Sequence, residues 1–106
     1  MQKRRLTDGG RIWSRVSNPS SGWDEATGVA VDSTGVYVVG YDTRPGNARW
    51  RMQKRRLTDG GRIWSRVSNP TTGSDWASGV AVDSTGVYIV GTQSGARSWR
   101  VEKRYP

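Results

Sequence analysis

The sequence contains no cysteine, no histidine and no phenylalanine among its 106 residues. Without cysteine, neither a disulfide bond nor a thiolate metal site can form. Without histidine, the commonest general base and the commonest neutral metal ligand are missing. No apolar run is long enough for a transmembrane helix, and no apolar stretch follows the basic residues near Met1, as a secretory signal requires. We therefore expect no membrane association, and the sequence indicates no particular cellular compartment.

No catalytic constellation replaces the missing histidine and cysteine. The sequence lacks the Gly-x-Ser-x-Gly pattern of a nucleophile elbow, and the adjacent acids Asp24 and Glu25 have no paired counterpart in the second half of the chain. Asp32 and Asp83 each begin a turn, where a carboxylate more often caps its own backbone than binds calcium. We therefore expect no enzyme activity, no cofactor and no metal site.

Basic residues outnumber acidic ones, with 17 Lys and Arg against nine Asp and Glu and a net charge of +8. Such a charge suits an anionic partner, such as a nucleic acid or an acidic polysaccharide, although a well-solvated Arg-rich surface is the simpler interpretation. Adjacent side chains of a strand point to opposite faces, so only alternate members of a basic run can share one patch. The candidate polyanion contacts are the two densest basic runs, Lys3, Arg4, Arg5, Lys54, Arg55 and Arg56.

A long internal repeat dominates the sequence. Residues 1–43 return as residues 52–94 with nine differences, and the first nineteen positions of the two copies are identical. Beyond this stretch the second copy is two residues shorter, so that Trp50 corresponds to Trp99. A period of about fifty residues is typical of solenoids, propellers and other arrays of stacked units.

Short runs rich in β-branched residues predict four antiparallel strands in each repeat. The letters DSTG at 32–35 and TDGG at 58–61 predict tight turns between strands, and no segment shows helical periodicity. In the central repeat the expected strands are residues 28–32, 35–40, 49–57 and 62–67. Four strands in about fifty residues are typical of a β-propeller blade, and the polarity of the strands rises from the first, innermost strand outward.

The stretch GVAVDSTGVYVVG, followed by WRMQKRRLTDGGRIW, resembles the SBBP-type β-propeller repeat. The resemblance covers nearly the whole chain, in both copies of the repeat. It implies an all-β propeller fold built from four-stranded antiparallel blades, but it implies no single activity, because propellers host many functions. The sequence departs from the family in one respect, since a propeller ring needs several blades and this chain holds about two.

The repeat divides the chain into one complete blade and two partial blades. We expect residues 1–25 to form the outer two strands of a blade shared with a neighbouring chain, residues 26–67 to form a complete blade, and residues 68–106 to form the inner three strands of a shared blade. Open blade faces would expose large apolar patches, and a cyclic homo-oligomer covers them. We expect such self-association, with a six-bladed trimer favoured and an eight-bladed tetramer next.

The two ends of the chain carry one further expectation and one alternative. The chain carries three stretches that fit the third strand of a blade, residues 1–6, 49–57 and 99–105. Residues 49–57 belong to the complete blade, so residues 1–6 and 99–105 compete for the one remaining place. We expect residues 99–105 to keep the shared place, because Trp99 supplies an aromatic anchor that residues 1–6 lack. The alternative is that the chain is a marginally folded piece of a longer propeller, which the missing tryptophan in the first of these stretches favours.

Tryptophan must fill much of the core because phenylalanine is absent. The strand tryptophans, which we expect to pack rather than to stack on sugars or bases, are Trp13, Trp50, Trp64 and Trp99. Trp23 and Trp76 lie in the loop before the innermost strand, where a lid over the inner strands is favoured over a carbohydrate contact. The expected core between blades consists of Val29, Val31, Val38, Val80, Val82 and Ile89.

The sequence therefore favours a structural or interaction module, a two-blade scaffold that assembles with itself into a closed β-propeller. Two alternatives stay open. One is a lectin-like binder that uses the loop residues Trp23 and Trp76, and the other is a polyanion binder that uses the Arg-rich rim.

Overall fold

The computed structural model of the chain describes residues 1–17, 24–43, 48–68, 74–93 and 98–106. These residues form strands and turns and no helix, and every pair of neighbouring strands is antiparallel, so the expected all-β class is confirmed. The strands are β1 (Gln2–Arg4), β2 (Arg11–Ser14), β3 (Asp24–Asp32), β4 (Gly35–Thr43), β5 (Ala48–Arg55), β6 (Arg62–Ser68), β7 (Trp76–Asp83), β8 (Gly86–Gln93) and β9 (Ser98–Arg104). Within these ranges no helix has the length and apolar character needed to cross a membrane.

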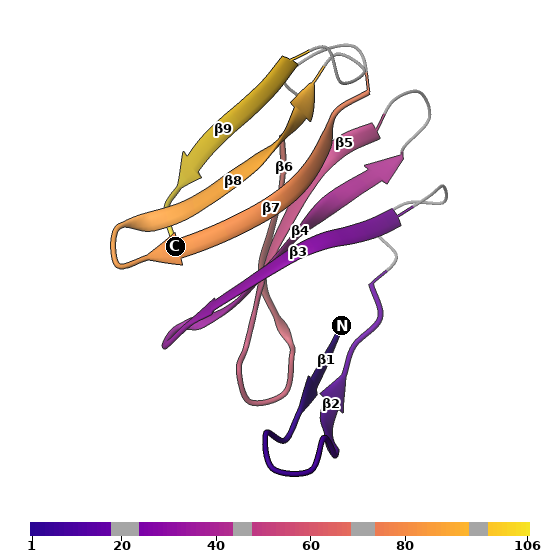
Figure 1. The fold of residues 1–106 in the computed structure, drawn as a ribbon, viewed down its shortest axis with the longest axis vertical. Helices are drawn as coiled ribbons and strands as arrows, with labels where there is room; N and C mark the ends of the chain where they lie inside the picture. The colour runs from indigo at the N-terminus through magenta and orange to yellow at the C-terminus, as the bar shows by residue number, and fades with distance from the viewer. Residues whose placement is uncertain (18–23, 44–47, 69–73, 94–97) are drawn as a thin grey trace.

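The strands form three separate sheets that follow one another along the chain (Figure 1). β1 and β2 form a hairpin, β3 to β6 form a four-stranded sheet, and β7 to β9 form a three-stranded sheet. Consecutive strands are neighbours in every sheet, so each sheet is a simple meander. Equivalent parts of the repeat therefore take equivalent places in their sheets.

The first strand of each larger sheet begins earlier than the sequence predicts. In β7 the register shifts once, between Ala77 and Gly79, and β3 has the same shift at the equivalent place. Such a bulge absorbs one residue and lets strand pairing continue beyond it. Trp76 is consequently the first residue of β7 and pairs with Thr92, which corrects its expected position in a loop.

Aspartate and glycine fix the tight turns that the sequence predicts. Asp32 Oδ1 accepts hydrogen bonds from the backbone N–H groups of Thr34 at 2.8 Å and Gly35 at 3.1 Å, and Asp83 repeats this arrangement in the second copy. In the turn between β5 and β6, Gly60 has a φ of 73°, a left-handed conformation that favours glycine. The carboxylates thus cap their own turns.

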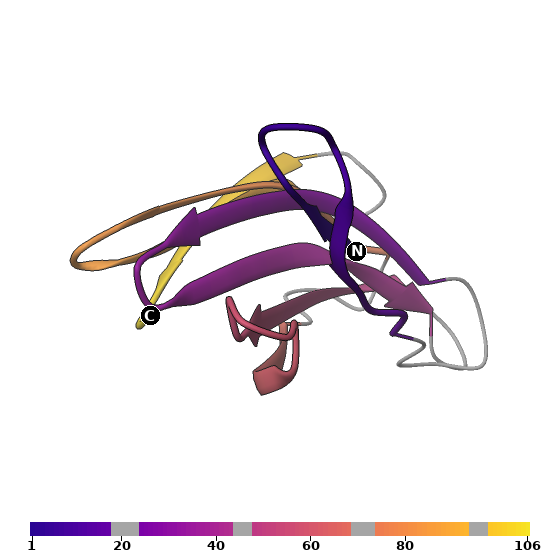
Figure 2. The same cartoon turned by 90° about the horizontal axis from the view of Figure 1, so that it is seen from below.

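The two larger sheets pack against each other, with β3, β4 and β5 in contact with β7. β3 and β7 approach closely at two glycines, because a Cβ on Gly28 would lie 3.2 Å from the Cα of Gly79. Seen from below, the strands of both sheets curve, and the β1–β2 hairpin lies in front of them (Figure 2). The buried core between the sheets consists of Tyr37, Val39, Trp50, Met52, Ala77, Val87 and Ile89.

The chain buries only part of the core expected between blades. Ile89 is buried in the contact between the two larger sheets. The half-buried members of the expected core are Val38, Val80 and Val82. Val29 and Val31 are instead 64% and 61% exposed, because the described strands leave this part of the β3–β4 surface uncovered. In the single chain these two valines are therefore exposed, and their burial between blades stays a prediction.

Candidate self-association surfaces

Trp50 anchors the packing of the two larger sheets. It lies on β5, and its indole Nε1 donates a hydrogen bond to the Thr92 carbonyl at 3.1 Å. Its ring lies against Gly91, where an added Cβ would come within 2.9 Å of a ring carbon. A glycine next to a backbone acceptor on β8 therefore makes a pocket for an indole ring.

Further hydrogen bonds join the same two sheets at their outer strands. Lys54 Nζ and Trp64 Nε1 both donate to the main-chain oxygen of Pro106, just beyond β9, at 3.0 Å and 3.2 Å. Ser68 Oγ donates to the Glu102 carboxylate at 2.7 Å. Together with the buried core, these contacts form what we call the internal interface, between the β3–β6 sheet and the β7–β9 sheet.

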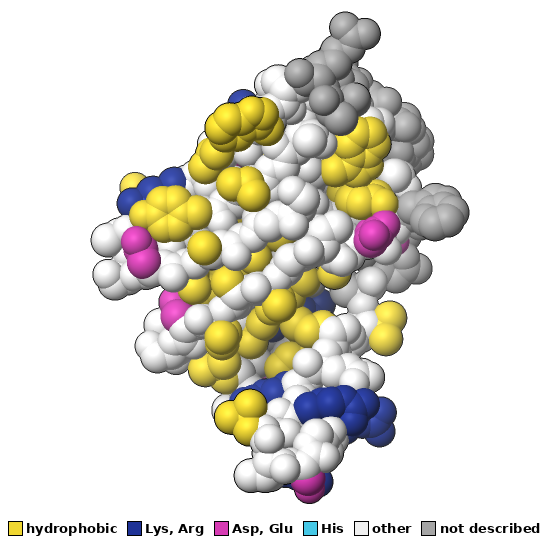
Figure 3. All heavy atoms as spheres, in the orientation of Figure 1, with side chains coloured by type: hydrophobic (Ala, Val, Ile, Leu, Met, Phe, Trp, Pro, Cys, Tyr) yellow, Lys and Arg dark blue, Asp and Glu magenta, His cyan; other side chains and the backbone are white. Residues whose placement is uncertain are grey.

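The β3–β6 sheet carries a second apolar surface, on the side opposite to the internal interface. The cross-strand pairs Val29–Val38 and Val31–Val36 place four valines on one side of the sheet, and we call these four residues the valine face. They line a hollow of about 580 Å³ next to the β1–β2 hairpin (Figure 3). Their counterparts in the second copy, which all lie in the internal interface, are Val80, Val82, Val87 and Ile89. The valine face thus repeats one half of the internal interface.

The β7–β9 sheet exposes the other half of the same contact. Val90, Trp99 and Val101, which we call the tryptophan face, are 41%, 80% and 55% exposed, and Figure 3 shows hydrophobic side chains at the surface over β8 and β9. Their counterparts in the first copy, which are 1%, 3% and 5% exposed in the internal interface, are Val39, Trp50 and Met52. These three positions of the repeat are therefore buried where a neighbouring sheet is present and exposed where it is not.

The basic run on β5 is engaged with the protein itself. Lys54 and Arg55 are buried, and Arg55 donates to the Gly60 carbonyl at 3.0 Å. Burial lowers the pKa of the Arg55 guanidinium. Arg56 is exposed and forms an ion pair with Asp59 at 2.9 Å. Lys54 and Arg55, two of the three expected polyanion contacts in the run 54–56, are thus buried within the chain, and Arg56 lies just beyond β5.

The equivalent run at the start of the chain is exposed but also has partners. Lys3 Nζ donates to the Leu57 carbonyl at 3.2 Å, Arg4 bonds within its own hairpin, and Arg5 pairs with Asp8 at 2.9 Å. The six basic candidates therefore make separate local contacts, and only Lys3, Arg4, Arg5 and Arg56 are exposed.

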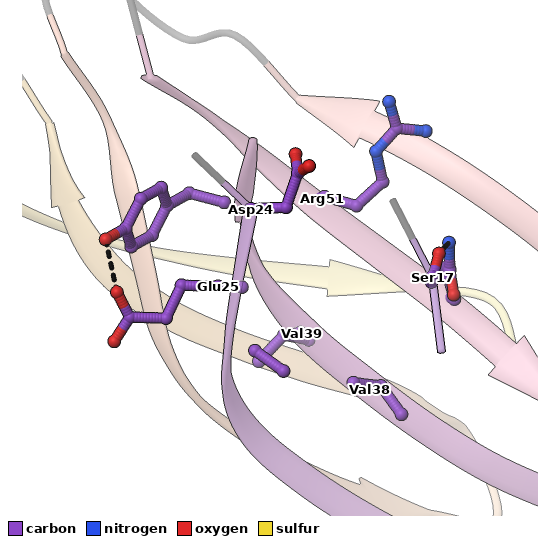
Figure 4. Close-up of a pocket in the computed structure, with 10 residues that line it drawn as sticks. Ser17, Asp24, Glu25, Val38, Val39 and Arg51 are labelled. Atoms are coloured by element: carbon purple, nitrogen blue, oxygen red, sulfur yellow. Dashed lines mark hydrogen bonds between the residues drawn. The ribbon is translucent and has the colours of Figure 1, made fainter. Parts of the chain in front are cut away.

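Of the two tryptophans considered for carbohydrate contact, the structure describes Trp76. Trp76 is half-buried, and its ring meets the ring of Tyr41 edge-on with centroids 6.5 Å apart. Trp23 lies outside the described residues. The Tyr41 hydroxyl also donates to the Glu25 carboxylate (Figure 4), which raises the pKa of Tyr41. Trp76 therefore packs beside a polar pair at the edge of β3 and β4.

A buried carboxylate escaped the sequence analysis. Asp42 at the end of β4 is fully buried and accepts hydrogen bonds from Arg49 Nε at 3.0 Å and Arg51 Nε at 2.7 Å. Arg51 also donates to Ser65 on β6 at 2.9 Å. The sequence does contain a signal for this cluster, because two arginines at alternate positions of a strand face the same side. The cluster ties three strands of the complete sheet together.

The carboxylates in the inner turns act as hydrogen-bond acceptors. The hydroxyl and backbone N–H of Thr85 both donate to Asp83 and hold its pKa down to about 2. Thr34 lowers the pKa of Asp32 in the same way. Among the residues that the structure describes, no group of three or more candidate ligands could hold a metal ion.

The valine face and the tryptophan face are the two halves of a contact that the chain already makes once. The internal interface shows how residues of these types pack, which hydrogen bonds accompany them, and how deeply they are buried. No family model, no curated protein and no solved structure matches this chain, so the interpretation of the two faces rests on the repeat itself.

Proposed function

We propose that the chain is a structural module, a two-blade β-propeller segment that joins copies of itself into a closed ring. The β3–β6 sheet is one complete blade. The β7–β9 sheet of one copy and β2 of the next copy together make a second blade of the SBBP-like type. This function needs no catalytic residue and no cofactor, and its partner is a second copy of the same chain.

The contrast between Trp50 and Trp99 carries this proposal. The two residues hold the same position in the repeat, yet one is 3% exposed and the other 80%. Stacking the tryptophan face of one copy on the valine face of the next repeats the internal interface between chains. Burial of a large apolar side chain contributes about 1.5–3 kcal/mol, and an apolar patch of this kind on a protein surface marks an interaction site.

The proposed ring contains an even number of blades, because every chain contributes two. The contact is heterologous, since a valine face meets a tryptophan face, and a heterologous contact closes only if the rotation between copies divides a full turn. We propose three chains and six blades, and four chains with eight blades are the alternative. Because each chain carries a net charge of +8, mutual repulsion opposes the ring, and added salt is expected to favour it.

Size-exclusion chromatography with light scattering tests this function. We expect the mass of three 11.7 kDa chains at micromolar concentration. The substitution Val29→Asp should reduce the mass to that of one chain, because the ring would bury an unpaired carboxylate. The control Thr58→Asp makes a charge change on an exposed turn and should keep the parent mass. A single-chain mass for the parent at every concentration and salt level, with cooperative unfolding, would refute the ring.

A further inference from the structure

The β1–β2 hairpin contacts the β3–β6 sheet in the same way that β5 and β6 contact the β7–β9 sheet. Lys3 Nζ and Trp13 Nε1 both donate to the Leu57 carbonyl, at 3.2 Å and 3.0 Å. Their counterparts Lys54 and Trp64 make the same two hydrogen bonds to the main-chain oxygen of Pro106. β1 and β2 therefore occupy the third-strand and fourth-strand places of a further sheet beside the valine face.

β9 is the third strand of its own sheet and corresponds in sequence to β1. Residues 101–104 read VEKR where residues 1–4 read MQKR, so that Lys103 corresponds to Lys3. When the tryptophan face of one copy stacks on the valine face of the next, β9 of the first copy arrives at the place held by β1 of the second. Lys103 then meets the carbonyl that Lys3 binds, and one of the two strands has to leave.

β9 is held in its sheet more firmly than β1 is held in its hairpin. All seven residues of β9 pair with β8. β1 pairs at three positions, with β2 alone, and all three of its residues are exposed. If β9 replaces β1, the hydrogen bonds lost from β2 are replaced by equivalent bonds, and the apolar residues of the tryptophan face are buried in addition.

The valine face also offers a pocket for the indole ring of Trp99. A pocket lies beside Val38, among residues of β3, β4 and β5 (Figure 4). Gly40 and Tyr41 are among the residues that line it. These two residues correspond in the repeat to the glycine and the carbonyl acceptor that hold Trp50 in the internal interface. The same glycine surface and the same backbone acceptor are therefore available to Trp99 of a second copy.

We propose that, during assembly, β9 of one copy displaces β1 of the next copy from β2, and that Trp99 enters the pocket beside Gly40 with its Nε1 donating to the Tyr41 carbonyl. This inference rests on the proposed ring. In the single chain β1 pairs with the edge of β2, and on assembly β9 of another copy replaces it. Only chains in which β1 has left β2 can then bind. The apparent dissociation constant between copies is therefore the intrinsic constant divided by the fraction of chains with β1 displaced.

Two engineered cysteine pairs distinguish a chain in which β1 pairs with β2 from an assembly in which β9 of a neighbouring copy pairs with β2. Both cysteine pairs share one position on β2. The chain has no cysteine of its own. Ser14 pairs with Gln2 in the single chain. After displacement it pairs with Glu102 of the neighbouring copy, as Ser65 pairs with Gln53 in the complete sheet. Directly opposed residues of an antiparallel pair have Cα atoms about 4.5–5.5 Å apart, within the reach of a disulfide.

The oxidised variants are compared by non-reducing electrophoresis and light scattering. Ser14→Cys with Glu102→Cys should link chains to one another. Ser14→Cys with Gln2→Cys should close within one chain, lock β1 in place and give a single-chain mass that returns to the ring mass on reduction. A ring that forms with the second disulfide closed would overturn the displacement and keep the ring. A single-chain mass for the parent and both variants under all conditions would overturn the ring as well.

Two further variants keep the test independent of the disulfides. Deletion of residues 1–5 should tighten association by about tenfold if β1 covers β2 in about nine chains of ten, and unchanged or weaker association would contradict the displacement. Trp99→Ala should loosen association by more than about tenfold, whereas Tyr105→Ala, at an exposed position beyond β9, should leave it unchanged. Equal effects of these two substitutions would contradict the pocket beside Gly40.

Discussion

The indole Nε1 of Trp50 donates to the Thr92 carbonyl, and this hydrogen bond joins two sheets that are built from the same repeated sequence. The donor and the acceptor lie on opposite sides of the contact, so each sheet presents one surface to the sheet before it and a different surface to the sheet after it. A stack of this kind always leaves one surface of each type at its ends. The valine face and the tryptophan face are those two surfaces.

Trp50→Ala is expected to destabilise the chain by about 3–5 kcal/mol, because it removes a buried aromatic ring and leaves a cavity beside Gly91. Trp99→Ala removes the same side chain at the equivalent, exposed position and should leave the stability of the single chain unchanged. Urea denaturation followed by circular dichroism, at a concentration too low for association, measures both. Similar losses of unfolding free energy in the two variants would show that the internal interface is not the source of stability.

A matched pair of valines tests the two sides of the proposed assembly. Val80 packs against the core between the sheets, whereas its counterpart Val29 is exposed. Val80→Asp should therefore destabilise the single chain by several kcal/mol, on the order of a small domain's whole stability, since it places an unpaired carboxylate against apolar side chains. Val29→Asp should leave the unfolding midpoint of the single chain in place. Equal unfolding midpoints for these two variants would contradict this difference.

The features that depend on local pattern were readable from the sequence. Strand alternation, the Asp-Ser-Thr-Gly turn and the glycines of the outer turns are set by neighbours within a few residues, and they predicted the all-β class. The repeat added the equivalence of distant segments, such as Trp50 with Trp99. A repeat of this kind predicts which residues share a role, although it does not say which of them have a neighbour to pack against.

The features that depend on tertiary contacts were not readable in the same way. Val29 and Val31 correspond to Val80 and Val82, which are half-buried against the core, and only their surroundings make the first two more exposed. Trp76 was assigned to a loop because the bulge that extends β7 has no separate sequence signature. Asp42 belongs to no motif that the sequence pattern singles out, and only the register of β4 and β5 sets Arg49 opposite to this buried residue.

Asp42→Asn tests the buried ion cluster of the complete sheet. The Asp42 carboxylate is fully buried between two arginines that are themselves largely covered. Loss of its charge weakens two charge-assisted hydrogen bonds, and we expect a loss of about 2 kcal/mol in the free energy of unfolding. The control Asp8→Asn removes the carboxylate of an exposed ion pair with Arg5 and should leave the urea midpoint nearly unchanged. Comparable shifts in the two midpoints would rule out a special role for the buried cluster.

The acid stability of the fold depends in part on the turn carboxylates. The pKa of Asp83 is lowered from 3.8 to about 2 in the folded chain, chiefly by the hydrogen bond from the Thr85 hydroxyl. A carboxyl group with a lower pKa in the folded state than in the unfolded state stabilises the fold when it is ionised. Its contribution is therefore complete above about pH 4 and is lost as the pH falls through about 2.

Asp83→Asn removes this titration. We expect the variant to be less stable than the parent near neutral pH and to lose less stability between about pH 4 and pH 2, because its turn has no carboxylate to protonate. Ser84→Asn, a neutral change at an exposed position of the same turn, should keep the pH dependence of the parent. Urea denaturation at a series of pH values, followed by tryptophan fluorescence, gives the unfolding free energies. Parallel curves for Asp83→Asn and the parent across this range would mean that the Asp83 carboxylate is not held in its ionised form by the turn.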